Sequence, residues 1–250
     1  MAHTQREGQY WDKITEDVEP FTEARQLVES LFPVEAFRGK DILDAGCGLG
    51  VYSATMAGFE AHTVTGFDIS MGSLRQASGN VPTGRFAQAS LSQLPYPSES
   101  FDMVWSWGAL HYVADSALAL HEIARVLKPG GVAVIHTYRH GAWASLEFGA
   151  GKLLSKTPHW MQELMLATGE RTIPLAVRLV TRRAPTAHTS KSIRQKLNER
   201  VFVPSDLRAF SFEQLCVGFG EGFQAREAHP PVPDLLKRNM SITVIAQKKA

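Results

Sequence analysis

The sequence predicts an α/β fold, with helices on both faces of a mostly parallel sheet, and three observations support this prediction. Short apolar runs alternate with helix-like stretches between residues 39 and 138, which is the pattern of βαβ units. The runs are apolar throughout, as expected of strands that are covered on both faces. The first run leads directly into three closely spaced glycines, as at a strand-to-helix turn in such folds.

The expected strands and helices follow one another along this region. The strand candidates are DILDA (41–45), TVTGFDI (63–69), FAQAS (86–90), FDMVWSW (101–107) and GVAVIHTY (131–138). The helix candidates are VYSATMAGF (51–59), MGSLRQAS (71–78) and LALHEIARVL (118–127). The segment LKPGG is expected to end the last of these helices and to open the strand after it, because proline cannot continue a helix and glycine accepts a positive φ.

The pattern changes after Tyr138. Residues from about 140 to 203 carry helical spacing, which predicts a helical insertion that covers the open end of the sheet. Between Arg139 and Arg200 the chain has eleven Lys or Arg against four Glu, although its formal net charge is only +1. This basic stretch fits either an anionic partner or an ordinary solvated helix surface. The chain then predicts a helix at 211–222 and two strands, at 223–231 and 240–249.

Composition indicates one large α/β domain, or a domain with an embedded cap, because 44% of the 250 residues are hydrophobic. Cys47 and Cys216 match no metal-ligand spacing, so we expect no metal site, no disulfide framework and a reducing compartment. The first residues lack the apolar stretch of a signal peptide, and no run approaches the ~18 apolar residues of a membrane-spanning helix. We therefore expect a cytoplasmic protein without a transmembrane segment.

The segment DILDAGCGLG carries the strongest chemical signal. Gly46, Gly48 and Gly50 allow the backbone to turn sharply and to approach a ligand where a Cβ would collide. The dinucleotide pattern G-x-G-x-x-G would need a glycine where this chain has Val51, so a nicotinamide cofactor is disfavoured. Asp44 adds a carboxylate beside the loop, which suits a cationic or zwitterionic ligand better than a pyrophosphate.

A second acidic residue independently indicates a nucleoside. Asp68 ends the segment GFD, 20 residues after Gly48. An acidic side chain at the carboxyl end of this strand can accept hydrogen bonds from both ribose hydroxyls. Two separate positions therefore agree on the same kind of ligand.

With these residues, the sequence resembles the class I S-adenosylmethionine-dependent methyltransferases, in particular the type 11, ubiquinone/menaquinone-like branch that acts on small molecules. The resemblance covers roughly residues 40 to 138. It rests on DILDAGCGLG, GFDIS, LPYPSESFDMVWSWGALHYVAD and LKPGG followed by a strand. It implies a Rossmann-like, seven-stranded sheet with a reversed last strand, and S-adenosylmethionine as cofactor.

The resemblance also implies which residues hold the cofactor. Asp44 and the backbone of Gly46 to Gly48 would face the methionine part, Asp68 the ribose and Ile69 the adenine. The full set of expected cofactor-binding residues is Tyr10, Asp44, Ala45, Gly46, Cys47, Gly48, Gly50, Asp68, Ile69, Ser90, Leu91, Ser106 and Trp107. Tyr10 is expected either in a lid over the cofactor or in the core. Ser90 stands where the family often has an aspartate that accepts from the adenine amino group, and a neutral hydroxyl is expected to bind that group more weakly.

Three residues are candidates for a catalytic role. His111 follows the fourth expected strand, at the edge where ligands bind in open α/β sheets, and it is the leading candidate for a general base. The alternative is a structural histidine that bonds to a backbone carbonyl. His136 and Tyr138, at the end of the fifth strand, are the next candidates.

The expected organisation has four parts: an N-terminal helical lid (1–38), a cofactor-binding core (39–138), a helical cap that forms the acceptor site (139–203) and the rest of the core sheet (204–250). The expected function is O-, N- or C-methylation of a small molecule that is partly apolar or anionic, by a monomer or a homodimer. The alternatives are a cofactor-binding protein of the same fold with other chemistry or a regulatory role, and an RNA methyltransferase. The second is disfavoured, because SWGA replaces an N-P-P-Y-type tetrad after the fourth strand.

Overall fold

The computed structural model describes residues 21–140, 208–230 and 241–250. All of these residues belong to one unit of the chain, formed by residues 1–140 and 208–250. Most of the expected lid up to residue 20, and the expected cap from residue 141 on, lie outside the described residues. Within the described stretches, no helix has the length and apolar character needed to span a membrane.

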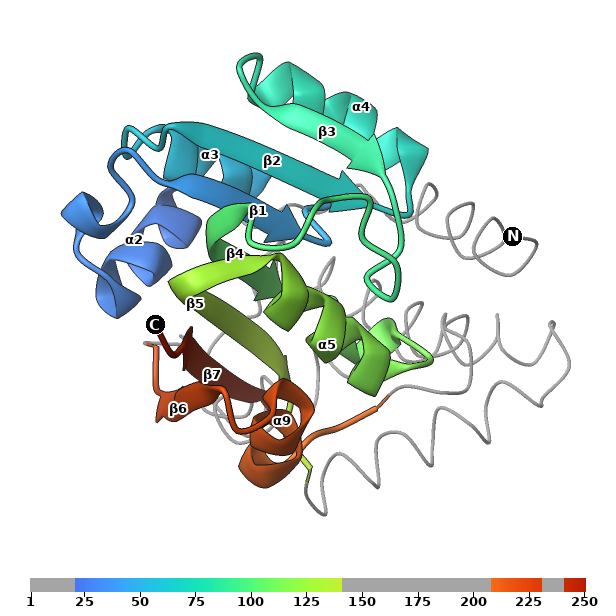
Figure 1. Ribbon diagram of the computed structural model, residues 1–250. Helices are drawn as coiled ribbons and strands as arrows, with labels where there is room; N and C mark the ends of the chain where they lie inside the picture. The colour runs from blue at the N-terminus through green and yellow to red at the C-terminus, as the bar shows by residue number, and fades with distance from the viewer. Residues whose placement is uncertain (1–20, 141–207, 231–240) are drawn as a thin grey trace, which may run out of the picture. The chain divides into compact units, whose positions relative to one another are not determined.

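The described strands form one seven-stranded sheet (Figure 1). They are β1 (Asp41–Ala45), β2 (Thr63–Asp68), β3 (Arg85–Gln88), β4 (Phe101–Trp107), β5 (Leu127–Tyr138), β6 (Phe223–Ala228) and β7 (Ser241–Lys248). Their order is β3-β2-β1-β4-β5-β7-β6. The first five pair in parallel, and β7 runs antiparallel to both β5 and β6. The prediction of a Rossmann-like, mostly parallel sheet with a reversed last strand is therefore confirmed.

Helices lie on both faces of this sheet, as predicted (Figure 1). The described helices are α2 (Phe21–Leu31), α3 (Val51–Ala57), α4 (Met71–Asn80), α5 (Ser116–Val126) and α9 (Phe212–Phe219), with single 3₁₀ turns at η1 (Val34–Ala36) and η2 (Leu110–Tyr112). Side chains of α2 and α3 join one hydrophobic cluster. Side chains of α5 and α9 join another.

The two clusters lie on opposite sides of the same strands, because successive side chains of a strand point to opposite faces. In β1, Ile42 packs in the cluster of α2 and α3, whereas Leu43 packs in the cluster of α5 and α9. Met103 and Val104 divide in the same way in β4. Each fully buried aliphatic side chain stabilises the fold by roughly 1.5–3 kcal/mol, so the continuously apolar strands follow from burial on both faces.

The segment LKPGG opens β5 directly after α5 ends at Val126, as predicted, and it does so with an irregular register. Leu127 already pairs with Phe101 as the first residue of β5, and the next pair joins Met103 to Val132. β5 therefore advances five residues while β4 advances two. Extra residues of this kind are absorbed as a bulge, and Gly130 provides the positive φ of 77°.

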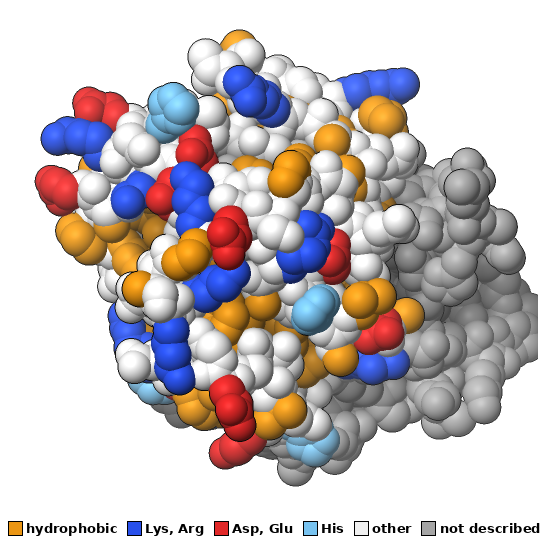
Figure 2. Space-filling view, in the orientation of Figure 1, with side chains coloured by type: hydrophobic (Ala, Val, Ile, Leu, Met, Phe, Trp, Pro, Cys, Tyr) orange, Lys and Arg blue, Asp and Glu red, His pale blue; other side chains and the backbone are white. Residues whose placement is uncertain are grey.

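Acidic and basic side chains are interspersed on the face of the molecule seen in Figure 2. The ion pairs Arg38–Glu60 and Arg125–Glu122 are examples from the described residues. Extended binding to a nucleic-acid backbone requires a large positively charged surface. The described part of this face presents no such surface.

Candidate functional site

The described residues that were predicted to bind a cofactor gather at the carboxyl ends of the strands, mainly β1, β2 and β4. β1 and β4 are neighbours in the sheet, although β2 and β3 lie between them in the sequence. The chain thus turns from one half of the sheet to the other between β1 and β4. Ligands of open α/β sheets bind outside the carboxyl ends of the strands at this point.

The glycine loop between β1 and α3 has the backbone conformation that its sequence predicted. Gly46, Gly48 and Gly50 have positive φ values of 78°, 51° and 78°. A side chain at Gly46 would place its Cβ 2.4 Å from the Cβ of Ala109, in the segment after β4. A Cβ at Gly48 would meet no atom of the described residues within 4 Å. The loop therefore packs tightly at its start and has open space at its middle, where a ligand can approach the backbone.

Asp44 is a buried carboxyl group directly below this loop. Only 2% of its surface is exposed, and the hydroxyl of Ser53 on α3 donates a hydrogen bond of 2.6 Å to its Oδ2. Burial raises the pKa of Asp44 to about 7, and the nearby carboxylate of Asp68 also raises it. A carboxyl group in this state gains from a cation placed beside it, because the cation favours the ionised form.

Asp68 connects the glycine loop to the start of α4. The backbone N–H of Gly48 donates to its Oδ2 and the N–H of Ser70 donates to its Oδ1, both at 2.9 Å. These two backbone bonds fix the orientation of the carboxylate, which can accept about four hydrogen bonds in all. Asp68 lies at the carboxyl end of β2, as the sequence predicted.

The end of β4 contains polar atoms that the protein itself does not satisfy. The Ser106 hydroxyl and the Trp105 indole N–H are buried and have no hydrogen-bond partner among the described residues. A buried polar group without a partner costs about 1–3 kcal/mol, so such atoms are a mark of a site that a ligand completes. The next residue, Trp107, packs its ring 5.6 Å from that of Tyr52 on α3.

The three predicted catalytic residues lie near the ends of β4 and β5, where His111 contacts Tyr138 and His136 contacts Trp107. The rings of His111 and Tyr138 lie 4.4 Å apart. The ring of His136 stacks on Trp107 at 4.0 Å with an angle of 6° between the planes. Burial lowers the pKa of His111 to about 3, and His136 also lowers it. His111 is therefore neutral at physiological pH and is enclosed, whereas His136 is only half-buried.

Other predicted cofactor residues lie along the same edge of the sheet. Ala45 ends β1 and is fully buried, and Cys47 is buried within the glycine loop. Burial raises the pKa of the Cys47 thiol far above its usual range, so this thiol is not a nucleophile. The backbone carbonyl of Ile69, after β2, accepts a 2.8 Å hydrogen bond from Gln88.

The departure at Ser90 has a local structural role. Its hydroxyl accepts a 3.3 Å hydrogen bond from the N–H of Ser92. The next residue, Leu91, is buried in the cluster of α5 and α9. Tyr10 lies outside the described residues.

Several residues that shape the site were not among the predicted ones. Ser53 donates to Asp44, and Ala109 excludes a side chain at Gly46. Thr243 and Thr137 each lie within hydrogen-bond distance of a histidine of the site. Only Ser53 had a local sequence signal, since it lies on the first turn of the helix that follows the glycine loop.

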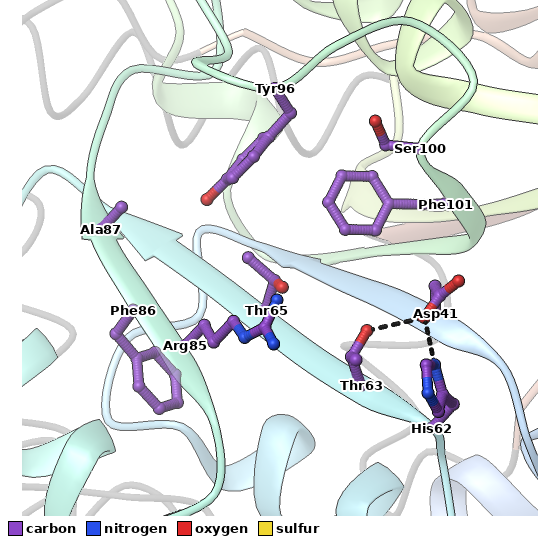
Figure 3. A pocket seen from close by; sticks show the side chains of 10 residues that line it. All are labelled: Asp41, His62, Thr63, Thr65, Arg85, Phe86, Ala87, Tyr96, Ser100 and Phe101. Atoms are coloured by element: carbon purple, nitrogen blue, oxygen red, sulfur yellow. Dashed lines mark hydrogen bonds and ion pairs between the residues drawn. The ribbon is translucent and has the colours of Figure 1, made fainter.

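A hollow among the described residues lies elsewhere, at the opposite edge of the sheet. It has a volume of about 450 Å³ and is lined by residues near the starts of β1, β2, β3 and β4. Figure 3 shows Tyr96 and Phe101 on one side of it, and Thr63, Thr65 and Arg85 on the other. None of the predicted site residues lines this hollow, so it is separate from the candidate site.

The order and direction of the strands are those of a class I S-adenosylmethionine-dependent methyltransferase core. Residues 43–135 match the family model of a methyltransferase domain. This stretch runs from β1 into β5 and contains the glycine loop, Asp68 and the end of β4. This match confirms the resemblance that was inferred from the motifs.

Individual relatives support the same family. The chain is 38% identical over 100 residues to a 2-methyl-6-phytyl-1,4-hydroquinone methyltransferase of Synechocystis, over 39% of this chain and 31% of that protein. It is 33% identical over 129 residues to a 27-O-demethylrifamycin SV methyltransferase of Amycolatopsis mediterranei, over 49% of this chain and 47% of that protein. The chain thus spans less than half the length of these relatives.

A solved structure shows that the likeness in fold extends beyond the matched stretch. The magnesium protoporphyrin IX methyltransferase of Synechocystis, solved with S-adenosylhomocysteine bound, has a TM-score of 0.59 with this chain. The comparison covers 96% of this chain and 93% of that chain, at 15% identity. At that identity the likeness concerns the fold alone.

The residues present at the site fit S-adenosylmethionine as the family's cofactor. The buried carboxyl of Asp44 suits a cationic ligand, and the open space beside Gly48 admits a ligand to the backbone. The unsatisfied hydroxyl of Ser106 offers a polar partner at the adjacent strand. In the described residues, no cluster of three His, Cys, Asp or Glu side chains could hold a metal ion.

Proposed function

We propose that this chain transfers the methyl group of S-adenosylmethionine to a small-molecule acceptor. The observation that supports this most strongly is the grouping, at one edge of the sheet, of Asp44, the open glycine loop and Asp68 next to the aromatic and imidazole rings of β4 and β5. The family of residues 43–135 supports the donor. Relatives named for a hydroquinone and for demethylrifamycin support a small-molecule acceptor.

Each residue has a definite part in this proposal. When bound, S-adenosylmethionine supplies a methyl carbon that the adjacent sulfonium makes electrophilic. Asp44 and the backbone of Gly46 to Gly48 hold the methionine part, Asp68 holds the ribose and Ile69 packs against the adenine. Ser106 and Trp107 approach the amino acid end of the cofactor. Holding the nucleophile, methyl carbon and sulfur in line contributes several kcal/mol to lowering the barrier, roughly up to the 7–11 kcal/mol of well-oriented reactions.

The acceptor in this proposal is recognised mainly by the cap. Residues 139–203 would supply most of the acceptor pocket, and the N-terminal part with Tyr10 would close the cofactor side. The basic residues of the cap favour an acceptor that carries a negative charge. Its apolar residues favour one that is partly hydrophobic.

Calorimetric titration with S-adenosylmethionine and with S-adenosylhomocysteine, with NADH as the control, tests this proposal. Both adenosyl ligands are expected to bind and NADH is not. Asp68→Ala is expected to abolish binding, whereas His111→Ala is expected to keep it and to slow methyl transfer. The absence of adenosyl binding would contradict the proposal.

Two further outcomes would indicate a different function for this chain. If the cofactor binds but no S-adenosylhomocysteine is released with any acceptor of a small-molecule panel, the chain is a cofactor-binding protein with another chemistry or a regulatory role. Salt-dependent binding of RNA, together with methylation of that RNA, would support a nucleic-acid methyltransferase instead.

A further inference from the structure

Two threonines lie within hydrogen-bond distance of the two histidines of the site. The pair of Thr243 and His136 lies on one face of the sheet, and the pair of Thr137 and His111 lies on the other. The hydroxyl oxygen of Thr243, on β7, lies 2.8 Å from Nδ1 of His136. The hydroxyl oxygen of Thr137, on β5, lies 3.3 Å from Nδ1 of His111. Both threonines are almost fully buried, with 2% and 1% of their surface exposed. Each pair is therefore shielded from competition by solvent.

The direction of these hydrogen bonds follows from what else the hydroxyls can do. A threonine hydroxyl carries one proton to donate. Within the described part of the chain, the histidine Nδ1 is the only hydrogen-bond partner of the Thr243 hydroxyl and of the Thr137 hydroxyl. If Nδ1 carried a proton and donated it, the buried hydroxyl proton would have no acceptor, at a cost of about 1–3 kcal/mol.

The hydroxyl proton therefore points at Nδ1, and Nδ1 accepts. An imidazole that accepts at Nδ1 is neutral and carries its single proton on Nε2. His111 fits this state, because its burial keeps it neutral. The parallel stack of His136 on Trp107, with 6° between the planes, fixes the plane of the second ring.

We infer that Thr243 is a positioning residue that holds His136 as a neutral ring with its proton on Nε2, so that His136 acts on the acceptor as a hydrogen-bond donor and not as a general base. Thr137 sets the same state in His111. This inference rests on the proposed function, since it concerns the acceptor of that reaction. It replaces the expectation that a histidine removes a proton from the acceptor.

The inference limits the class of acceptor. Because the two described histidines supply N–H donors and not a base, they favour a nucleophilic oxygen that is already ionised near neutral pH, such as a carboxylate or an acidic phenol. That oxygen forms its bond to the methyl carbon while the carbon–sulfur bond breaks and its electron pair stays on sulfur. No proton is transferred in this step, so no base is required.

Nitrogen-15 NMR of the histidine side chains tests the tautomer directly. The full chain is labelled at histidine and measured with and without S-adenosylhomocysteine, and His136→Gln assigns the His136 signals. In the wild type, Nε2 is expected to give the resonance of a protonated nitrogen, and Nδ1 that of an unprotonated nitrogen shifted by an accepted hydrogen bond. Thr243→Val should remove the hydrogen-bond shift at Nδ1, and Thr243→Ser should retain it.

The controls separate this effect from a general loss of structure. Thr65→Val makes the same change at another buried strand position, on β2, and should leave the His136 signals unchanged. A protonated Nδ1 in the wild type would overturn the inference, and so would an Nδ1 shift that is the same in wild type and Thr243→Val. If Thr243→Val does not fold, the wild-type and Thr243→Ser spectra still decide the tautomer. Because the unliganded chain is also measured, a failure of cofactor binding is distinguished from a failure of this inference.

Matched acceptors test the substrate class. Benzoic acid is compared with benzyl alcohol, and 4-nitrophenol with cyclohexanol, by the S-adenosylhomocysteine that each releases. The acid of a pair is expected to be methylated at least tenfold faster than its alcohol. An alcohol that is methylated as fast as its matched acid would require a base and would overturn the inference.

Discussion

At the scale of single residues, the hydroxyl group of Ser53 and the absence of a side chain at Gly46 determine much of the geometry of the glycine loop. The Ser53 hydroxyl donates a hydrogen bond of 2.6 Å to the buried Asp44 carboxyl. The absence of a Cβ at Gly46 lets the loop pass Ala109. The motif predicted that the glycines were needed, but their partners come from α3 and from the segment after β4.

The raised pKa of Asp44 gives a prediction for pH dependence. Its folded-state pKa of about 7 lies above the ordinary value of 3.8, so its contribution to stability is fully present below pH 3.8 and is lost as pH rises through 7. Asp44→Asn should therefore stabilise the ligand-free chain at pH 8 by an amount on the order of 1 kcal/mol or more, and by much less at pH 5. Thermal unfolding at the two pH values measures this difference.

The same substitution should weaken the binding of S-adenosylmethionine more than that of S-adenosylhomocysteine, because only the first carries the sulfonium charge. Calorimetry at pH 8 compares the two ligands. An equal gain in stability at pH 5 and pH 8 would show that Asp44 does not titrate in this range.

Gly46→Ala tests the close approach of the loop to Ala109. Gly39 provides a matched control, because it also has a positive φ, 69°, but a Cβ added there would have nothing within 4 Å. Gly39→Ala should cost roughly 1–2 kcal/mol of stability from backbone strain alone. Gly46→Ala should cost more in urea unfolding and should also abolish cofactor binding, since the loop must move.

The double variant Gly46→Ala/Ala109→Gly makes room for the added methyl group. It should recover part of the stability and of the cofactor binding that Gly46→Ala loses. No recovery would mean that strain, and not the 2.4 Å contact, is responsible.

At the scale of strands and helices, local sequence signals predicted most elements and failed where a distant partner decides. The segment 63–69 was predicted as a strand and is one from Thr63 to Asp68, because its apolar run is local information. Proline and glycine in LKPGG predicted a break between helix and strand, and α5 does end at Val126, but only the pairing of Leu127 with Phe101 of β4 shows that β5 begins at once. The pair of His136 and Thr243 could not be predicted, since 107 residues separate them and antiparallel register alone brings them together.

Lys128, within LKPGG, ties three strands together at the edge opposite the site. Its Nζ lies 2.9 Å from a carboxylate oxygen of Asp41 on β1 and 2.9 Å from one of Asp102 on β4. Lys128 holds the pKa of Asp41 well below its usual range, and His62 also lowers it. Because Asp41 is ionised above its depressed pKa, this contribution to stability is present at neutral pH and is lost only in strong acid.

Lys128→Met should therefore lower the free energy of unfolding by about 1 kcal/mol at pH 7, a value limited by partial exposure of the pair. Urea unfolding is measured at pH 7 and at about pH 2.5, roughly one unit below the ordinary carboxyl pKa. The loss of unfolding free energy caused by Lys128→Met should be smaller at the acidic pH. Lys40→Met is the control, since Lys40 lies farther from Asp102, at 3.8 Å, and is more exposed. Affinity for S-adenosylhomocysteine should not change in either variant, and a change in it would mean that the two edges are coupled.

At the scale of the whole molecule, the order of strands builds the site from segments that are distant in sequence. The motifs predicted where Asp44, the glycines and Asp68 lie in the fold, because all of them stand at or directly after the ends of their strands. The half formed by β5 and β7 depends on the reversed strand, whose side chains carry no motif. Family resemblance therefore predicted the sheet, whereas the pairing of the histidines required the structure.

The two positions at which the chain leaves and re-enters the core predict which segment of the chain can be removed. The N–H of His140 donates to the carbonyl of Phe210, and the N–H of Phe210 donates to the carbonyl of Tyr138, both at 2.9 Å. Replacing residues 141–207 by a short Gly-Ser linker should therefore leave a folded core that binds S-adenosylhomocysteine within about tenfold of the full chain, roughly 1.4 kcal/mol. Methyl transfer should be lost, because the proposed cap is absent. Calorimetry and thermal unfolding measure the first two results, and retained methyl transfer would show that the acceptor site lies in the core.

These two hydrogen bonds also bear on how such a protein can diversify. Because they fix the two ends of the intervening segment side by side, the segment can lengthen, shorten or be exchanged at little entropic cost, since that cost grows only with the logarithm of its length. The N–H of Arg208 donates to the carbonyl of His111, so the returning chain is fastened directly beside the candidate site. Recombination at this junction would exchange the proposed acceptor-binding segment while the sheet is inherited intact.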